Sequence, residues 1–389
     1  MKIFHTADWH LGKLVQGVHM TEDQAYVLDE LIEAIKQEKP DVLIIAGDLY
    51  DRAIPPPEAI QLLDESLMKI VVDLKVPVLA IAGNHDSPNR LHFGSHMMKQ
   101  SGYHIVGNLN KTIEKVTYED EFGPVHFYLV PYADPAQVRN LYEDDTIQTF
   151  DDATRRIVDD IKQEMDPNDR HVFITHAFVT PYGEKEANTS ESEKPLSIGG
   201  AEYVSSEHFK AFDYTALGHL HQAHKVGQET IRYSGSILKY SLSEEHHDKG
   251  YLVVDLDEAG HVTVEKKSLI PRRDIRTVRG KLDELLAGEK SDDYVFVELT
   301  DEHVVLQPME KIRTVFPNAM QVKRVNDPVI RQITQDQEKR DVRTLSDLEL
   351  FRAFYEEIYG KAVPDDLEEL FIESLNKQLE NEREGGLNK

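Results

Sequence analysis

Short apolar runs, each followed at once by a polar cluster, recur along the first two thirds of the chain. Runs of this kind are typical of buried strands in a layered α/β sheet. Between the first three runs, apolar residues at three- and four-residue spacing predict helices that begin near Thr21 and Pro57. The order from Met1 to about Ser101 is therefore βαβαβα, which predicts an α/β domain.

The first predicted helix has a capping-box pattern at its start, because Thr21 and Gln24 are spaced to bond each other's backbone. Pro40 is expected to end this helix. Its apolar face is formed by Leu28, Leu31, Ile32 and Ile35.

Further strand-like runs between His104 and Tyr132 predict a second sheet stacked on the first. A helical segment around residues 151–164 then leads to another strand before His176. Beyond Leu269 the pattern becomes a small βαβαβ unit without polar strand ends. The predicted fold class is α/β: two stacked sheets flanked by helices, a small α+β cap domain and a C-terminal helical pair.

The chain of 389 residues is long for one domain. We expect residues 1–268 to form the main domain, 269–327 the cap, 328–344 a polar linker and 345–380 the helical pair. The polar segment Glu184–Gly199 is expected to form a loop at the rim of the site.

The polar residues that end the predicted strands carry the candidate chemistry. An apolar run that ends in Gly47-Asp48 places a carboxylate at the edge where open α/β sheets bind ligands. Converging Asp, Asn and His side chains suit Mn²⁺, Fe²⁺ or Zn²⁺, and the carboxylates favour Mn²⁺. The residues at these strand ends are Asp8, His10, Asp48, Asn84, His85, Asp86, His176, His219 and His221.

Two metal ions at such an edge would activate water and clamp both reacting oxygens of a phosphodiester. Asp48 ends the central run and is the candidate bridging carboxylate. Each motif alone has an ordinary explanation, such as a helix cap or a turn. The ordered set, with every motif at a strand end, is not expected by chance. No Gly-x-x-x-x-Gly-Lys-Ser/Thr motif occurs, which excludes a P-loop NTPase.

The net charge is −27, from 44 Lys and Arg against 71 Asp and Glu. A chain that binds nucleic acid alone is expected to be basic. However, net charge describes solubility and long-range steering rather than one groove, and bound cations reverse the sign of a carboxylate-rich cleft. DNA therefore stays possible as a substrate, with a partner supplying basic surface.

The chain has no cysteine, which removes disulfides and thiolate metal sites and suits a reducing compartment. No signal-peptide pattern precedes the first strand, and no apolar run is long enough to span a membrane. We expect a cytoplasmic protein that does not enter the membrane.

The ordered motifs resemble the calcineurin-like metallophosphoesterase superfamily. Within it, the chain is similar to bacterial nuclease subunits that work with an SbcC-like ATPase, and the similarity covers nearly the whole chain. The shared motifs are Asp8-x-His10, Gly47-Asp48, Gly83-Asn84-His85-Asp86, His176 and Gly218-His219-x-His221. The closer match extends over His5 to Gly12, Ala46 to Asp51, Ile81 to Ser87, Tyr233 to Ser236 and Glu244.

This resemblance implies a Mn²⁺-dependent exonuclease and endonuclease that opens DNA ends and hairpins under ATP control. One ion would be held by Asp8, His10, Asp48 and His221. The other would be held by Asp48, Asn84, His176 and His219. His85 would be a catalytic group that binds no metal, with Asp86 orienting its ring. Other branches carry His where Asp51 stands, so no role is transferred to Asp51.

Two protein partners are expected. Apolar residues near Pro57–Lys75 and Asn89–Ser101 exceed what packing on one sheet face needs, which predicts a homodimer. The helices of Ser346 to Leu379 are expected to dock on the ATPase. The alternative for these helices is that their apolar stripes pack only on each other or on the cap.

Two other functions stay open. An enzyme of the same superfamily could hydrolyse small phosphate esters or cyclic nucleotides, although the cap and the helical tail argue against it. A non-catalytic tether of DNA ends would keep metals only for structure. His85 argues against the tether, because a purely structural site needs no unliganded histidine.

Overall fold

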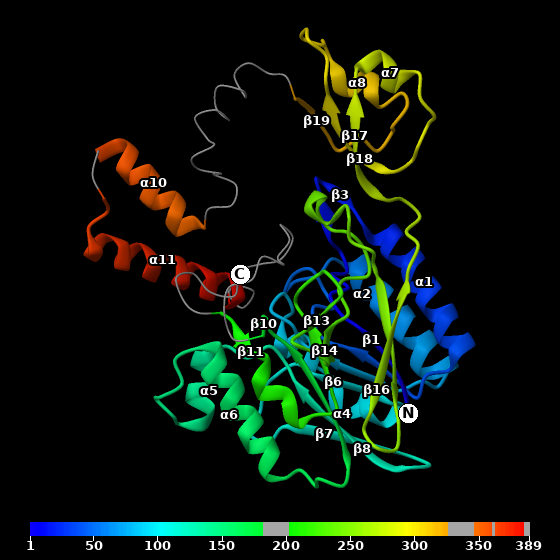
Figure 1. The fold of residues 1–389 in the computed structure, drawn as a ribbon, viewed down its shortest axis with the longest axis vertical. Helices are drawn as coiled ribbons and strands as arrows, with labels where there is room; N and C mark the ends of the chain where they lie inside the picture. The colour runs from blue at the N-terminus through cyan, green and yellow to red at the C-terminus, as the bar shows by residue number, and fades with distance from the viewer. Residues whose placement is uncertain (182–201, 326–345, 360–361, 385–389) are drawn as a thin grey trace. The chain divides into compact units, whose positions relative to one another are not determined.

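The computed structural model describes residues 1–181, 202–325, 346–359 and 362–384 (Figure 1). Both Glu184–Gly199 and the predicted linker 328–344 lie outside these ranges. The described residues fall into two compact units, the larger made of 1–181, 202–240 and 246–272. The smaller unit contains 241–245 and the described residues from 273 onward. None of the described helices has the length and apolar character of a membrane span.

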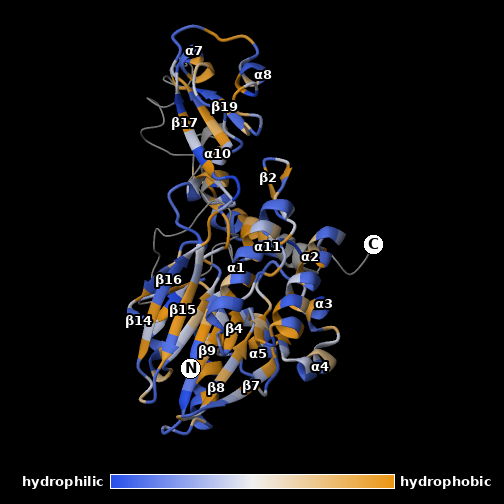
Figure 2. Cartoon of the chain, turned by 90° about the vertical axis from the view of Figure 1, so that its right-hand side faces the viewer, coloured by the Kyte–Doolittle hydropathy of each residue, from blue (hydrophilic) through white to orange (hydrophobic). Residues whose placement is uncertain are grey.

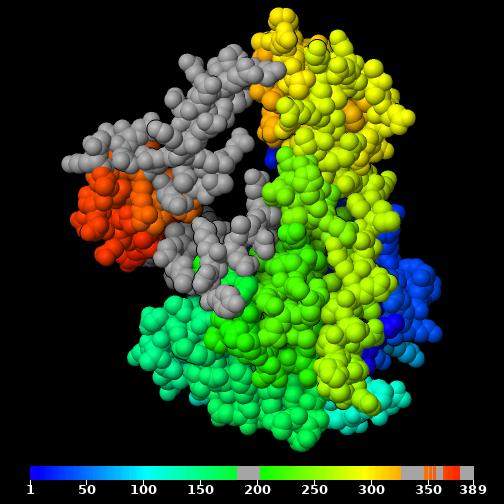
Figure 3. All heavy atoms as spheres, in the orientation of Figure 1, coloured from blue at the N-terminus to red at the C-terminus, as the bar shows by residue number. Residues whose placement is uncertain are grey.

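The larger unit contains two six-stranded sheets, the first in the order β16-β15-β1-β4-β5-β6. Its parallel strands are β1 (Lys2–Thr6), β4 (Val42–Ile45), β5 (Val78–Ile81) and β6 (Tyr103–Val106). β15 (Gly250–Leu256) runs antiparallel to β1, and the edge strand β16 (Val262–Ser268) runs antiparallel to β15. Because β15 pairs with β1, residues far apart in sequence lie side by side. At the surface, blue N-terminal residues also adjoin the yellow-green segment, as Figure 3 shows.

The second sheet has the order β13-β14-β12-β9-β8-β7 and confirms the predicted stacked sheet. Its parallel strands are β8 (Gly123–Val130), β9 (Arg170–His176), β12 (Tyr214–Gly218) and β14 (Gln228–Tyr233). The antiparallel edge strands are β7 (Glu114–Asp120) and β13 (His224–Val226).

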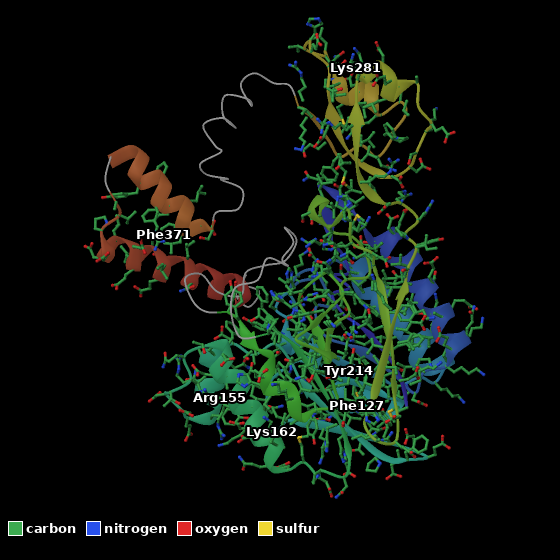
Figure 4. All side chains as sticks on the ribbon, in the orientation of Figure 1. Phe127, Arg155, Lys162, Tyr214, Lys281 and Phe371 are labelled. Atoms are coloured by element: carbon green, nitrogen blue, oxygen red, sulfur yellow. The ribbon has the colours of Figure 1, made fainter. Side chains whose placement is uncertain are left out.

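Side chains from both sheets share one hydrophobic core. Ile44 and Leu79 of the first sheet belong to the same buried cluster as Phe127, Ile174 and Tyr214 of the second. Figure 2 shows β4 and β9 as strongly hydrophobic strands, and Figure 4 labels Phe127 and Tyr214 in the interior. Burial on this scale fixes the two sheets, and therefore the ends of their strands, relative to each other.

The main helices follow the predicted order. They are α1 (Thr21–Glu38), α2 (Pro57–Leu67) with a π-helical continuation (Met68–Asp73), α5 (Pro135–Tyr142) and α6 (Phe150–Gln163). The shorter elements are β2 (Leu14–Val15), β3 (Val18–His19), α3 (Pro88–His92), α4 (Ser95–Met98), η2 (Lys99–Ser101), β10 (Val179–Thr180), β11 (Val204–Ser205) and η3 (Ser206–Ala211).

The predicted capping box of α1 is wrong. Met20 occupies the N-cap position and makes no side-chain cap bond. The side chain of Gln24 is fully buried and instead donates to the carbonyl groups of Trp9 and His10, while accepting from the amide of Gly12. The Gln24 side chain thus bonds the loop after β1 instead of capping the helix.

The smaller unit contains the predicted βαβαβ arrangement. Its parallel strands are β17 (Ile275–Gly280), β18 (Tyr294–Leu299) and β19 (Gln321–Arg324), and its short helices are α7 (Leu282–Leu286) and α8 (Pro308–Ile312). The 3-10 turn η4 (Leu242–Glu244) also belongs here. This sheet has its own core, which includes Val295, Val297 and Ile312.

Two helices end the described chain, α10 (Asp347–Tyr359) and α11 (Asp365–Glu384). The rings of Phe351 and Phe371 stack with centroids 3.9 Å apart, and Figure 4 labels Phe371 on α11. Part of the apolar stripes therefore packs within the pair. Other apolar side chains stay exposed: Leu350 at 44%, Phe354 at 59% and Leu370 at 58%.

Candidate metal centre

Every predicted metal ligand lies at, or directly after, the carboxyl end of a parallel strand. Asp8 and His10 follow β1, Asp48 follows β4, Asn84 follows β5, His176 ends β9, and His219 and His221 follow β12. Asn84 is half-buried and the others are buried. The two stacked sheets thus bring residues from both halves of the larger unit to one place.

Four of these residues have a left-handed or related backbone conformation. The φ angles are 54° at Asp8, 46° at His10, 51° at Asp48 and 112° at His219. Non-glycine residues pay roughly 1–3 kcal/mol for such conformations, which therefore persist only where surrounding contacts enforce them. Strained positions of this kind therefore occur in three of the loops that carry candidate ligands.

One group of side chains gathers around His10 and His221, whose Nε2 atoms lie 3.0 Å apart. With Asp8 they offer three ligand atoms within 4.8 Å of one another. The Asp8 carboxylate also accepts the backbone amide of His219, at 3.1 Å to each oxygen. Two buried imidazole nitrogens that face each other next to a carboxylate fit a bound cation.

A second group gathers around Asn84. Its Oδ1 lies 3.0 Å from Nε2 of His176 and 3.2 Å from Nδ1 of His219. Nδ1 of His176 bonds the Ala46 carbonyl at 2.9 Å, which fixes a proton there and directs Nε2 into the site. An amide oxygen and two imidazoles form a second possible ligand set.

Asp48 lies between the two groups. Its Oδ2 is 3.6 Å from Nε2 of His10 and 3.4 Å from Nε2 of His176. Its Oδ1 accepts the backbone amide of His85 at 2.9 Å. The structure thus places this carboxylate where one oxygen can serve both ligand groups.

Glycines next to the ligands allow this close approach. A Cβ atom on Gly83 would lie 2.2 Å from Oδ1 of Asp48 and 2.5 Å from its backbone nitrogen. A Cβ atom on Gly47 would lie 2.3 Å from Nδ1 of His176. Any larger residue at either position would displace a candidate ligand.

Burial and mutual charge set the protonation of the site. Burial lowers the pKa of His10 and of His219 well below the ordinary value, so both rings are neutral and can ligate. Burial opposes ionisation of Asp48, but the charges of His176 and His85 hold its pKa well below the ordinary range. Burial raises the pKa of Asp8 to about 7.

His85 is buried beside these groups without joining either. Its Nδ1 bonds the backbone carbonyl of Asp51 at 2.7 Å, and its Nε2 lies 4.0 Å from Oδ2 of Asp48. The ring therefore presents Nε2 to the space beside the predicted bridging carboxylate.

Asp86 has a different position from the one expected. Its carboxylate accepts the backbone amides of Leu49 at 3.1 Å, Tyr50 at 2.9 Å and Gly83 at 3.0 Å. These bonds join the loops after β4 and β5, and the carbonyl of Asp51, not Asp86, orients the His85 ring. Asp86 is thus a positioning residue for the two loops.

Sequence reasoning missed two side chains that hold ligand-bearing loops. Gln24 bonds the carbonyl of His10 at 2.8 Å, and the buried Nζ of Lys249 donates to the carbonyl of His221 at 2.8 Å and to Ser236 at 2.9 Å. The sequence pattern assigned Gln24 to a helix cap rather than to this loop, and Lys249 lies in none of the motifs named above.

The amino-acid sequence matches two known families. Residues 1–223 match the calcineurin-like phosphoesterase family, and residues 271–359 match a family described as the type 5 capsule protein repressor C-terminal domain. The chain belongs to the calcineurin-like phosphoesterase family, whose fold implies divalent metal ions.

Within this class, the chain is 34% identical over 329 residues to the SbcD subunit of the nuclease SbcCD from Staphylococcus epidermidis. The match covers 84% of this chain and 86% of the relative. It confirms the resemblance to bacterial nuclease subunits.

Solved structures are more distant. GAP50, the anchor in the inner membrane complex of Plasmodium, is 10% identical with a TM-score of 0.41, covering 84% of this chain and 98% of that chain. A dimetal phosphatase from Danio rerio is 9% identical with a TM-score of 0.40, covering 70% and 97%. The family assignment rests on the sequence matches.

Proposed function

We propose that the chain is a Mn²⁺-dependent DNA exonuclease and endonuclease that processes double-strand ends and hairpins in repair and recombination. The observation that carries this proposal is the position of Asp48, whose Oδ2 lies 3.6 Å from His10 and 3.4 Å from His176. Similarity to a component of the SbcCD nuclease supports DNA as the substrate.

The residues present fit two divalent ions. One set comprises Asp8, His10, Asp48 and His221, and the other comprises Asp48, Asn84, His176 and His219. These sets combine carboxylate, amide and imidazole donors in a chain without cysteine, which favours Mn²⁺ over a thiolate metal site. When bound, two such ions supply a nucleophile near neutral pH and stabilise the attacking and leaving oxygens.

His85 provides the proton chemistry in this proposal. The Asp51 carbonyl keeps a proton at Nδ1, so a second proton at Nε2 would make the ring an imidazolium facing the site. From there Nε2 donates to a phosphate oxygen or to the leaving oxygen. Asp86 and Gln24 hold the loops that position this ring and His10.

An SbcC-like ATPase is the proposed protein partner, docked on residues 345–380. Exposed Leu350, Phe354 and Leu370 support this surface, because apolar patches of this kind mark interfaces. Residues 269–327 are the proposed DNA-contacting cap, and residues 1–268 the nuclease domain.

A homodimer is proposed through the helices that follow β4 and β5. Met97 on α4 is 71% exposed, Phe93 between α3 and α4 is 82% exposed, and Met68 at the start of the π-helical continuation is 50% exposed. Leu63, an apolar residue of the segment Pro57–Lys75 that was expected to form this surface, is only 5% exposed and packs inside the unit. The proposed interface therefore uses the outer side of α2 and its π-helical continuation together with α3 and α4.

The decisive experiment digests a hairpin-ended DNA duplex with Mn²⁺, with and without the ATPase. Cleavage by the wild-type chain and none by Asp48→Asn would support the proposal. Turnover of an aryl phosphate with no DNA cleavage would indicate a small-ester phosphatase instead. Binding of DNA ends with intact metals but no turnover of either substrate would indicate a tether.

A further inference from the structure

Asp51 lies between two histidines of the candidate centre. Its backbone carbonyl bonds Nδ1 of His85 at 2.7 Å, and its Oδ1 lies 3.8 Å from Nδ1 of His10. The two imidazole rings meet edge to face, with centroids 4.6 Å apart. The Asp51 side chain is 19% exposed, so its carboxylate lies at the margin of the buried site.

The two ring nitrogens of His10 have different surroundings. Its Nε2 faces His221 and Asp48, as expected for a ligand atom. Its Nδ1 is buried and makes no hydrogen bond to any residue that the structure describes. If Nε2 ligates, Nδ1 must carry the proton of the neutral ring, and a buried N–H without an acceptor costs about 1–3 kcal/mol.

His176 provides an internal comparison. This predicted ligand of the second group has its Nδ1 proton fixed on the Ala46 carbonyl at 2.9 Å. Metal-ligating histidines generally donate their other N–H to a carbonyl or carboxylate. For His10 the structure places Oδ1 of Asp51 opposite the corresponding nitrogen, at 3.8 Å, which is too far for a hydrogen bond.

Lys13 forms an ion pair with the same carboxylate oxygen of Asp51. Its Nζ lies 2.7 Å from the same Oδ1 of Asp51, and its side chain is only 13% exposed. The ammonium group and the His10 N–H therefore compete for one carboxylate oxygen. The charge of Lys13 also argues against a further cation held by His10, Asp51 and His85, although their ligand atoms lie within 4.8 Å of one another.

We propose that Asp51 is the positioning residue of His10. Its carboxylate accepts the Nδ1 proton of His10 and so fixes the tautomer that presents Nε2 to a metal ion, while Lys13 weakens this bond by competing for Oδ1. The inference rests on the proposed function, because it requires His10 to be a ligand. Loss of such an outer partner typically weakens metal binding about 10–100-fold.

The test is a calorimetric titration of Mn²⁺ alone into the full chain and its variants. Asp51→Ala is expected to weaken one Mn²⁺ site about 10–100-fold and to leave the other unchanged. Asp51→Asn should lose less, because its amide oxygen still accepts the His10 proton. Lys13→Met should bind Mn²⁺ at least as tightly as the wild type, because the competing donor is gone.

Two results would overturn the proposal. One is wild-type binding at both sites in Asp51→Ala. The other is an equal loss in Lys13→Met, which would make the ion pair itself the structural requirement. If Asp51→Ala does not fold, the comparison of the single variants Asp51→Asn and Lys13→Met decides. The proposal predicts weaker Mn²⁺ binding in Asp51→Asn and unchanged or tighter binding in Lys13→Met. Asp48→Asn is the control: if it also binds two Mn²⁺ normally, the proposed metal centre fails rather than the role of Asp51.

Discussion

Oδ2 of Asp48 lies 3.4 Å from Nε2 of His176, with both side chains almost completely buried. Burial by itself would lower the pKa of His176, but the charge of Asp48 raises it to about 9. The same attraction holds the pKa of Asp48 well below its usual range. At neutral pH and without metal, His176 therefore carries a proton. Its positive charge offsets the negative charge of Asp48, which a divalent ion would otherwise neutralise.

Metal binding should consequently release a proton. Because His176 must lose its Nε2 proton to ligate, Mn²⁺ affinity should rise up to about tenfold per pH unit above pH 7 and level off near pH 9. Calorimetry in two buffers with different ionisation enthalpies measures the protons released.

The pairing of protonated His176 with Asp48 should stabilise the metal-free fold fully below pH 6.5, and this contribution should fade as pH rises through about 9. A pH-independent Mn²⁺ affinity would contradict this account.

Asp48→Asn should reduce occupancy at both metal sites together. The substitution removes one anionic oxygen that lies within 3.6 Å of a ligand from each group. Metal analysis after gel filtration in Mn²⁺ measures the stoichiometry. Asp159→Asn on the exposed face of α6 is the matched control and should keep both ions. Two ions bound with unchanged affinity in Asp48→Asn would refute the bridging role.

His85→Asn should abolish DNA cleavage while sparing both metals. The ring lies 4.0 Å from Oδ2 of Asp48 and takes part in neither ligand group, so its loss removes only a proton donor. General acid–base groups typically contribute about 10²–10⁴-fold to the rate. Single-turnover cleavage and Mn²⁺ stoichiometry should be measured on the same preparation. If the variant also lost its metal, His85 would be a ligand.

Gly83→Ala should destabilise the larger unit and weaken metal binding. The added methyl group would lie 2.2 Å from Oδ1 of Asp48 and 2.5 Å from its backbone, where a buried core cannot give way. Overpacking of this kind typically costs about 1–3 kcal/mol. Gly288→Ala, whose nearest neighbour would be 3.3 Å away, is the control. Equal denaturation midpoints for the two variants would argue against a close-packed ligand loop.

The strands and their polar ends were predictable because both signals are local. The run before Asp48 is apolar throughout since β4 is buried on both faces, and the ligand types follow directly in sequence. The structure confirms the two stacked sheets and the βαβαβ unit for the same reason. Boundaries shifted slightly, as at β9, which includes His176 although the strand was expected to end before this residue.

Long-range contacts were not predictable. The failed capping box at Gln24, the amides that Asp86 binds and the Lys249 bond to His221 each join segments that only the fold brings together. The positive φ angles at Asp8 and Asp48 depend on the same contacts. A local pattern gives the ligand types, whereas the loops that aim them are fixed by tertiary hydrogen bonds.

The C-terminal helices provide the last prediction, which separates partner docking from catalysis. Phe351 and Phe371 stack on each other, so they hold the pair together rather than form its outer surface. Phe354 and Leu370, at 59% and 58% exposed, are the two most exposed of the apolar side chains described on this pair and are available to a partner.

Phe354→Glu and Leu370→Glu should therefore abolish co-purification with an SbcC-like ATPase while leaving Mn²⁺ nuclease activity on single-stranded DNA unchanged. A charge in an apolar contact is strongly unfavourable, whereas on an exposed face it should cost the isolated chain little. Glu373→Gln, on the exposed part of α11, is the control and should bind the ATPase normally.

Deletion after Arg340 should reproduce the loss of the partner and remove any ATP dependence. Full-strength partner binding by the deleted chain would place the docking surface elsewhere, and loss of nuclease activity in the point variants would mean that these helices also serve the active site.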